Sequence, residues 1–134
     1  MTPTENFRVC LRHYADRNID AIAAMFADNI TLRDWNICVV GKAAVVAETA
    51  RNFAAAQSIE IHVQHLYQGT DAVVGELKII LDGKTELFVV DVMTFNAEGR
   101  IRSIRAYLGR ADDPVAGPGC MKHVGLCLLT GKIG

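Results

Sequence analysis

The segment Glu86–Gly109, with the sequence ELFVVDVMTFNAEGRIRSIRAYLG, decides which fold the rest of the chain can adopt. It predicts two β-strands, Glu86–Phe95 and Arg100–Leu108, joined by the short polar turn 96–99. One acid, Asp91, lies among the valines of the first strand. A carboxylate in such an apolar run must become neutral or find a partner, because an ionised group is costly to bury. Asp91 is therefore the first candidate for a functional residue, and its alternative role is a hydrogen-bonded structural group.

Upstream of this segment, the hydrophobic spacing predicts helices and one early strand. Apolar residues recur every three or four positions in three stretches, Thr4–Asn18, Asp20–Phe26 and Ala43–Gln57. Thr4 and Asp20 are the expected caps of the first two helices, and Gly41-Lys42 opens the third. Residues 27–35 switch to strand character.

From Ser58 the pattern changes to a period of two. Ile59, Ile61 and Val63 share one face, and the same phase continues to His65 and Tyr67. A further strand follows at Ala72–Leu81, and Asp82-Gly83 is a strong signal for a two-residue hairpin. Three helices, an early strand and a four-strand meander predict an α+β domain, with the helices packed on the concave face of a curved antiparallel sheet.

Composition limits the class of protein. The chain has 134 residues, 51% of them hydrophobic, which suffices for one domain with a sizeable core. We assign 1–109 to this domain and 110–134 to a C-terminal extension, which either adds an edge strand or reaches another subunit. The net charge is −1 without a basic stripe, so we expect no nucleic-acid partner.

The sequence also suggests a compartment. No apolar run approaches the roughly 20 residues of a membrane span, and no signal peptide is recognisable, so we expect a cytoplasmic protein without membrane contact. The cysteines are widely spaced and fit reduced thiols. The alternative is a metal site at Cys120, His123 and Cys127, but their spacing fits no standard set, and we expect no metal.

The hairpin signal predicts which side chains share a face with Asp91. If Asp82-Gly83 are the two loop residues, Val74 lies opposite Asp91 and Glu76 lies opposite Val89. Asp91 would then share the concave face with Val89, Met93 and Glu76. Two acids on such a face would influence each other and raise at least one pKa. The alternative for Glu76 is a solvated pair with Lys78.

Three stretches carry a family resemblance: YADRNIDAIAAMFADNITLRDW, VGKAAVVAETARNF and FVVDVMTFNAEGRIRSIRAYLG. Together they resemble the NTF2-like cone fold, also described as a cystatin-like roll. Within that superfamily the chain is most similar to ketosteroid isomerases and to polyketide-cyclase-type, SnoaL-like proteins. The resemblance covers roughly Phe7 to Gly109.

This resemblance implies roles for individual residues. Asp34 falls where the isomerases hold the carboxylate base, and Asp91 falls where they hold a protonated aspartic acid that donates to the oxyanion. The isomerase tyrosine that shares this task falls at Cys10, and a thiol is a poor donor. Tyr14, one helical turn further, lies on a similar face and could replace it. Trp35 stands where the isomerases favour a proline, and a large indole there would narrow the mouth of the cone or stack on a flat ligand.

The leading hypothesis is therefore a small-molecule enzyme that moves a proton next to a carbonyl, as an isomerase, cyclase or dehydratase does. Its enzyme class would be an isomerase or lyase similar to steroid Δ-isomerase. Asp34, Asp91 and Tyr14 would be catalytic, and such catalysis needs no cofactor. A small apolar or partly polar ligand would contact Trp35, His65, Tyr67, Glu76, Val89, Met93 and Cys10. The alternative is a non-catalytic ligand-binding or dimerisation module. We also expect a homodimer that pairs through the outer face of the sheet.

Overall fold

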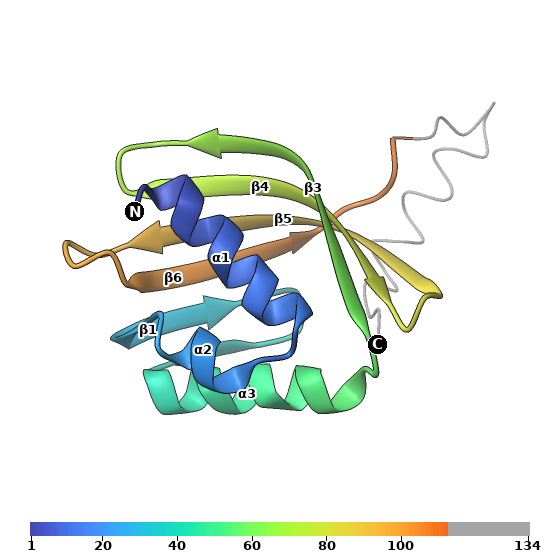
Figure 1. Cartoon of the computed structure of the whole chain (residues 1–134), viewed down its shortest axis with the longest axis horizontal. Helices are drawn as coiled ribbons and strands as arrows, with labels where there is room; N and C mark the ends of the chain where they lie inside the picture. Colours follow the sequence, from blue (N-terminus) through green and yellow to red (C-terminus); the bar gives the residue numbers. More distant parts are fainter. Residues whose placement is uncertain (113–134) are drawn as a thin grey trace.

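The fold is a curved six-stranded sheet with helices over its concave face, as seen in a computed structural model that describes residues 1–112 (Figure 1). The helices are α1 (Pro3–Ala15), α2 (Ile19–Ala23) and α3 (Lys42–Ala55). The strands are β1 (Phe26–Arg33), β2 (Cys38–Val40), β3 (Ile59–Gln68), β4 (Ala72–Leu81), β5 (Thr85–Phe95) and β6 (Ile101–Leu108). This arrangement confirms the predicted α+β cone fold.

The strands follow the order β2-β1-β6-β5-β4-β3 across the sheet. Strand β1 runs parallel to β6, and the other neighbours are antiparallel. The sheet is therefore mixed, and the short edge strand β2 is an element that the sequence did not reveal. The register shifts within the β3–β4, β5–β6 and β1–β6 pairs. Such irregularities bend and twist strands, which gives the sheet its concave side.

Local chemistry sets where the first two helices begin. Thr2 and Glu5 form a reciprocal capping box, with Pro3 in the first turn, so α1 starts before the predicted cap Thr4. Asn18, instead of Asp20, caps α2 by accepting a hydrogen bond from the backbone of Ala21.

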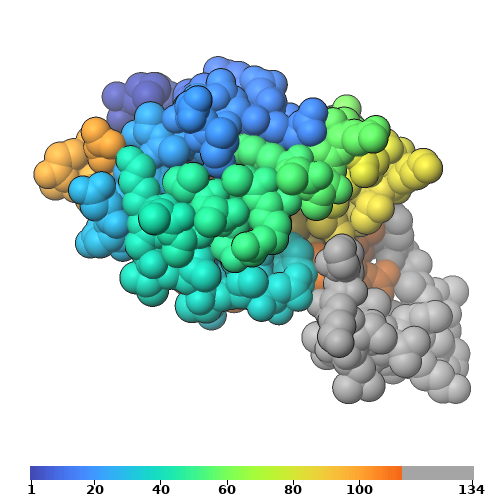
Figure 2. Space-filling view, turned by 90° about the horizontal axis from the view of Figure 1, so that it is seen from below, coloured from blue at the N-terminus to red at the C-terminus, as the bar shows by residue number. Residues whose placement is uncertain are grey.

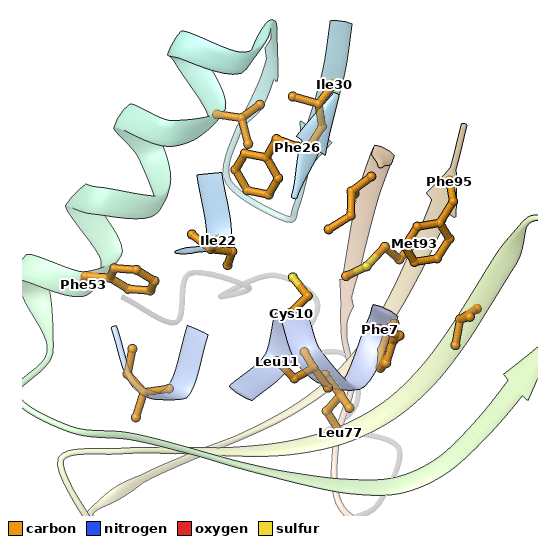
Figure 3. Packing of buried hydrophobic residues seen from close by; sticks show 14 of the residues in the cluster. Phe7, Cys10, Leu11, Ile22, Phe26, Ile30, Phe53, Leu77, Met93 and Phe95 are labelled. Atoms are coloured by element: carbon orange, nitrogen blue, oxygen red, sulfur yellow. The ribbon is translucent and has the colours of Figure 1, made fainter. Parts of the chain in front are cut away.

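The core lies between the helices and the concave face of the sheet. From α1, Phe7, Cys10 and Leu11 point toward β-strand residues such as Leu77 and Met93 (Figure 3). Burying these side chains supplies most of the driving force that holds α1 on the sheet. Viewed from below, α3 covers much of the surface and α1 lies along its edge (Figure 2).

The hairpin between β4 and β5 differs from the prediction by one residue. Leu81 pairs with Thr85, so the connection contains three residues instead of two. Gly75 therefore lies opposite Asp91, and Glu76 lies opposite Val90. Because side chains alternate along a strand, this slip turns Glu76 to the outer face. The prediction that Glu76 shares a face with Asp91 is wrong.

A bulge in β3 overturns a second expectation. The register of β3 against β4 shifts between Val63 and His65, so an extra residue interrupts the alternation. Leu66 then packs against the core, whereas His65 and Tyr67 are exposed. The prediction that these two side chains continue the apolar face is wrong, because the bulge reverses the phase of everything beyond it. The predictions for the tail, including its edge strand and the Cys120–His123–Cys127 alternative, lie outside the described residues.

Candidate functional site

Asp91 lies on the concave face of β5 between two small neighbours. Gly75 on β4 and Ala106 on β6 are its partners across the sheet. Asp91 is half-buried, whereas Val89 and Met93 on the same face are 4% and 1% exposed. Asp91 therefore keeps some accessible surface on a face where the neighbouring side chains have almost none. Ala106 carries only a methyl group, so its side chain takes up little of the space beside Asp91.

The absence of a side chain at Gly75 serves the packing of α1. A Cβ atom at this position would lie 2.5 Å from Cζ of Phe7, far inside van der Waals contact. The fully buried Phe7 ring therefore sits directly over Gly75 and closes one side of the space next to Asp91.

Asp34 lies at the same level of the sheet as Asp91. It follows Arg33, the β1 partner of Arg105, while Asp91 is the partner of the next residue of β6, Ala106. Ala106 thus separates the two acidic positions, whose backbones are two strand spacings apart, or about 10 Å.

The turn after β1 holds the Asp34 side chain in place. Its Oδ1 accepts hydrogen bonds from the backbone N–H groups of Asn36 (2.7 Å) and Ile37 (2.8 Å). Asp34 also donates its own N–H to the carbonyl of Ile37 at 2.9 Å. Within residues 1–112, Oδ2 has no hydrogen-bond donor, so this oxygen is free to meet a ligand.

The carboxyl of Asp91 titrates near neutral pH, so a part of it is protonated there. Burial raises its pKa and the negative charge of Asp34 adds to this effect, which together bring the pKa from 3.8 to about 7. The charge of Asp34 acts on Asp91, so the two acids lie within electrostatic range of each other. An acid of this kind can donate a hydrogen bond while its partner remains an acceptor.

Tyr14 belongs to the same group of side chains. Burial raises its pKa, the hydrogen bond from Asn52 opposes this, and the charges of Asp91 and Asp34 add to the increase, which brings the pKa to about 12. The nearby Cys10 thiol is 3% exposed, and burial together with the charge of Asp91 raises its pKa to about 12. Cys10 therefore stays protonated and packs in the core, whereas Tyr14 is half-buried.

Two features near these residues were not predicted from the sequence: the contacts of Tyr14 with α3 and the buried Nε1 of Trp35. Asn52 of α3 donates from Nδ2 to the Tyr14 hydroxyl at 3.0 Å, and Phe53 packs edge-on against the Tyr14 ring with centroids 4.8 Å apart. No motif marks this exposed asparagine. Trp35 adds a buried Nε1 that has no hydrogen-bond partner in the part of the chain that the structure describes. A buried orphan donor is uncommon and is available to a ligand.

Three predicted ligand contacts lie elsewhere. His65, Tyr67 and Glu76 belong to the outer face, where the Tyr67 hydroxyl donates a hydrogen bond to Glu76 and this contact raises the pKa of Tyr67. Asp34 thus acts on Asp91, and both act on Tyr14, through their charges, whereas His65, Tyr67 and Glu76 lie on the opposite face of the sheet. Val89 and Met93 stay on the face of Asp91 as buried wall residues.

Two surface hollows lie away from the acids. One of about 360 Å³ is bordered by Glu76, Lys78 and Phe88, and another of about 510 Å³ by Asn6, His13 and Arg100. Neither is lined by Asp34, Asp91 or Tyr14. Among residues 1–112, no group of three His, Cys, Asp or Glu side chains is arranged to hold a metal ion. The helices of this part of the chain are all too short or too polar to cross a membrane.

Residues 8–104 match the profile of the SnoaL-like domain. The chain belongs to this family. No curated protein matches it in sequence. Among solved structures, the epoxide hydrolase/cyclase-like enzyme SalBIII, described as acting in pyran ring formation in the polyether salinomycin, is 26% identical, with a TM-score of 0.71 over 82% of this chain and 92% of that one.

Two further solved structures share the fold at lower identity. A SnoaL-like protein of unknown function from Burkholderia thailandensis is 16% identical, with a TM-score of 0.71 over 81% of this chain and 94% of that one. A computationally designed 17-OHP binder is 17% identical, with a TM-score of 0.72 over 81% and 95% of the two chains. These likenesses confirm the NTF2-like, SnoaL-like fold that the sequence predicted.

Proposed function

We propose that the protein is a small-molecule enzyme that moves a proton next to a carbonyl group without a cofactor. The observation that supports this most is that Asp91, with a pKa of about 7, is partly protonated near neutral pH within electrostatic range of Asp34, whose side chain is fixed by backbone N–H groups. This chemistry requires at least an acid and a base at one site.

The proposed reaction uses three side chains. Oδ2 of Asp34 takes a proton from the carbon next to the carbonyl, and the electron pair of the broken C–H bond moves to the carbonyl oxygen. Tyr14 and protonated Asp91 donate hydrogen bonds to the enolate oxygen that forms. Asp34 then returns the proton to a different carbon, which isomerises the substrate and restores the enzyme. An elimination or ring closure would begin with the same proton transfer.

The charges around the site favour an uncharged ligand. The groups that shift the pKa values of Asp91 and Tyr14 through their charge are carboxyls and the Cys10 thiol, with no Lys, Arg or His among them. A carboxylate or phosphate on the ligand would therefore meet repulsion and no counter-ion. A neutral ketone, with its ring against apolar walls such as Met93, and with Trp35 as a further donor, fits better.

Deuterium exchange tests this proposal. 2-Tetralone is a neutral cyclic ketone, and the exchange of its α-protons in D₂O can be followed by NMR above the buffer rate. We expect Asp34→Asn to lower the protein-dependent rate by about 10²-fold or more, because it removes the base. Asp91→Asn and Tyr14→Phe should have smaller effects, and Glu76→Gln on the outer face should have none.

The rate of α-proton exchange should also decrease as the pH rises through neutrality. Asp91 donates only while protonated, so activity should decrease as the pH rises through about 7. If no enolisable ketone exchanges faster with the protein than in buffer, the catalytic proposal is wrong. If ligands still raise the melting temperature of Asp34→Asn and Asp91→Asn, the alternative of a binding module is then favoured.

A second candidate function rests on the likeness to SalBIII. The same acid–base pair can open an epoxide with an internal hydroxyl group. Asp91 would give its proton to the epoxide oxygen as the C–O bond breaks, and Asp34 would take the hydroxyl proton as the new C–O bond forms. The cyclic ether is an isomer of the hydroxy-epoxide, so chromatography can follow its formation as a new peak of the same mass. This assay distinguishes epoxide opening from α-proton exchange.

For the assembly, we propose a homodimer that pairs through the outer face of the sheet. Half-buried apolar side chains, including Val90 and Val92, lie on this face, and Tyr107 is 46% exposed there. Arg33 stacks on the Tyr107 ring, its guanidinium carbon 5.1 Å from the centroid. A two-fold axis along the strands would bring this basic side of one copy over the Glu76 side of the other.

Light scattering tests this assembly at micromolar concentration. Val92→Arg should halve the mass, because a charge would be buried at the centre of the interface. A monomeric natural protein would contradict the proposal. The free thiols Cys10 and Cys38 are compatible with a reducing compartment, and we propose a cytoplasmic location on that basis.

A further inference from the structure

Asn52 makes a contact that the proposed reaction does not yet use. It is an exposed residue of α3, and its amide Nδ2 donates to the Tyr14 hydroxyl oxygen at 3.0 Å. The next residue, Phe53, holds the Tyr14 ring in an edge-on contact with an interplanar angle of 76°. Helix α3 therefore holds both the ring and the hydroxyl of a residue that belongs to α1.

The direction of this hydrogen bond decides what Tyr14 can do. A phenol has one proton to donate, and the Asn52 amide occupies a lone pair of its oxygen. Among the described residues, the Tyr14 hydroxyl has no acceptor for that proton. The proton is therefore available to an acceptor outside the protein. Asp91 and Asp34 are near enough for their charges to act on Tyr14.

The same bond strengthens Tyr14 as a donor. Burial raises the pKa of Tyr14, and the hydrogen bond from Asn52 is the one influence that lowers it. A phenol that already accepts a hydrogen bond is polarised and donates more strongly, since linked hydrogen bonds reinforce each other.

We infer that Asn52 is a positioning residue, which orients Tyr14 so that its hydroxyl donates to an uncharged acceptor oxygen of the ligand. This inference rests on the proposed site and names what the ligand must present to it: a carbonyl or ether oxygen near Tyr14. Asn52 acts through Tyr14 and does not contact the reacting atoms itself.

A pair of ligands that differ by one oxygen tests the inference by binding alone. 2-Tetralone carries the acceptor and tetralin lacks it, and the ratio of their affinities can be measured by quenching of the single tryptophan, Trp35. We expect Tyr14→Phe to lower this ratio by about three- to tenfold, the worth of one neutral hydrogen bond.

Three variants of α3 distinguish positioning from structural support. Asn52→Asp should lower the ratio as much as Tyr14→Phe, because the carboxylate would take the hydroxyl proton for itself. Asn52→Ala should lower it less, since Tyr14 stays free to donate but loses its orientation. Arg51→Ala is the matched control on the neighbouring position, whose side chain pairs with Glu48, and should leave the ratio unchanged.

A double-mutant cycle supplies the decisive comparison. In the Tyr14→Phe background, Asn52→Asp should cause no further loss, because the two residues act as one unit. The inference is overturned if Asn52→Asp keeps the natural ratio, or if it lowers the ratio equally with and without the Tyr14 hydroxyl. Thermal melting followed by circular dichroism shows whether each variant is folded at the temperature of the affinity measurements.

This binding test is separate from the catalytic proposal. If the natural protein prefers 2-tetralone over tetralin but does not exchange its α-protons, the proposed reaction fails and the inference about Asn52 is still decided by the variants. If the natural protein shows no preference for the ketone, both the donor role of Tyr14 and the inference are overturned.

Discussion

Replacing Asp91 by asparagine should make the protein more stable, and the gain should grow with pH. The side chain lies on the concave face, where burial and the charge of Asp34 raise its pKa from 3.8 to about 7. An asparagine has nearly the same shape as the protonated acid but can never ionise. Asp91→Asn therefore removes the cost of holding an ionised carboxylate at this position.

The sign and size of the effect follow from the two pKa values. Below pH 3.8 the carboxyl is protonated in both the folded and the unfolded chain, so the substitution is nearly neutral. Between this pH and about 7, the unfolded chain has lost the proton and the folded chain retains it, so the free energy of unfolding of the natural protein decreases as the pH rises. Each pKa unit corresponds to about 1.36 kcal/mol, which gives a plateau of about 4 kcal/mol above neutrality.

Urea unfolding monitored by Trp35 fluorescence measures this difference at fixed protein concentration. We expect Asp91→Asn to raise the free energy of unfolding by about 1 kcal/mol at pH 4.5 and by about 2 to 4 kcal/mol at pH 8. The matched control is Asp28→Asn, at an exposed position of β1, which should change stability by less than about 0.5 kcal/mol at either pH.

A second substitution separates the two causes of the shift. In an Asp34→Asn background the gain from Asp91→Asn should be smaller at pH 8, because one source of the raised pKa is gone. A gain that is equal at both pH values, or a loss of stability at pH 8, would refute the argument that Asp91 is held neutral in the folded protein.

Three other substitutions test the space beside Asp91 and the packing around it. Gly75→Ala should lower the free energy of unfolding by about 1 to 3 kcal/mol, because the new methyl group would clash with the Phe7 ring, and the additional change Phe7→Leu should recover part of the loss in thermal melting. Ala106→Leu should abolish binding of 2-tetralone in fluorescence titration while the protein stays folded, because the larger side chain fills the space between the two acids; unchanged affinity would place the ligand elsewhere. Arg17→Met should lower stability by about 1 kcal/mol, because its guanidinium donates to the Ala56 carbonyl at 2.7 Å at the end of α3, and a melting temperature unaffected by the change would mean that this contact contributes nothing.

Local patterns were sufficient for the order and type of most elements. The apolar period of three to four residues in α1 and α3, and the alternation in β3 to β6, follow from which side chains must face one core, so they can be read from neighbours in sequence. Asp91 could be singled out for the same reason, since an acid within a valine-rich strand is conspicuous whatever the fold. The family resemblance added Asp34, which no local pattern distinguishes from other acids.

Local patterns could not predict which face a side chain occupies beyond a bulge or a hairpin of unknown length. The phase of His65 and Tyr67 depends on one extra residue in β3, and the side of Glu76 depends on whether a hairpin has two or three connecting residues. Both depend on small differences in backbone geometry, and each reverses the face of every later side chain.

The sequence by itself thus determined the α+β cone and the main candidate for a functional residue, Asp91. Both follow from the spacing of apolar residues along the chain, which is a local pattern. The family resemblance already named Asp34 and Tyr14, and only the tertiary structure decided their placement: Asp34 lies across Ala106 from Asp91, and Asn52 contacts Tyr14. These residues belong to β5, α1, α3 and the turn after β1, which are far apart in the chain. The pKa of about 7 arises from this assembly, because a charge is destabilised by its surroundings in space and not by its neighbours in sequence.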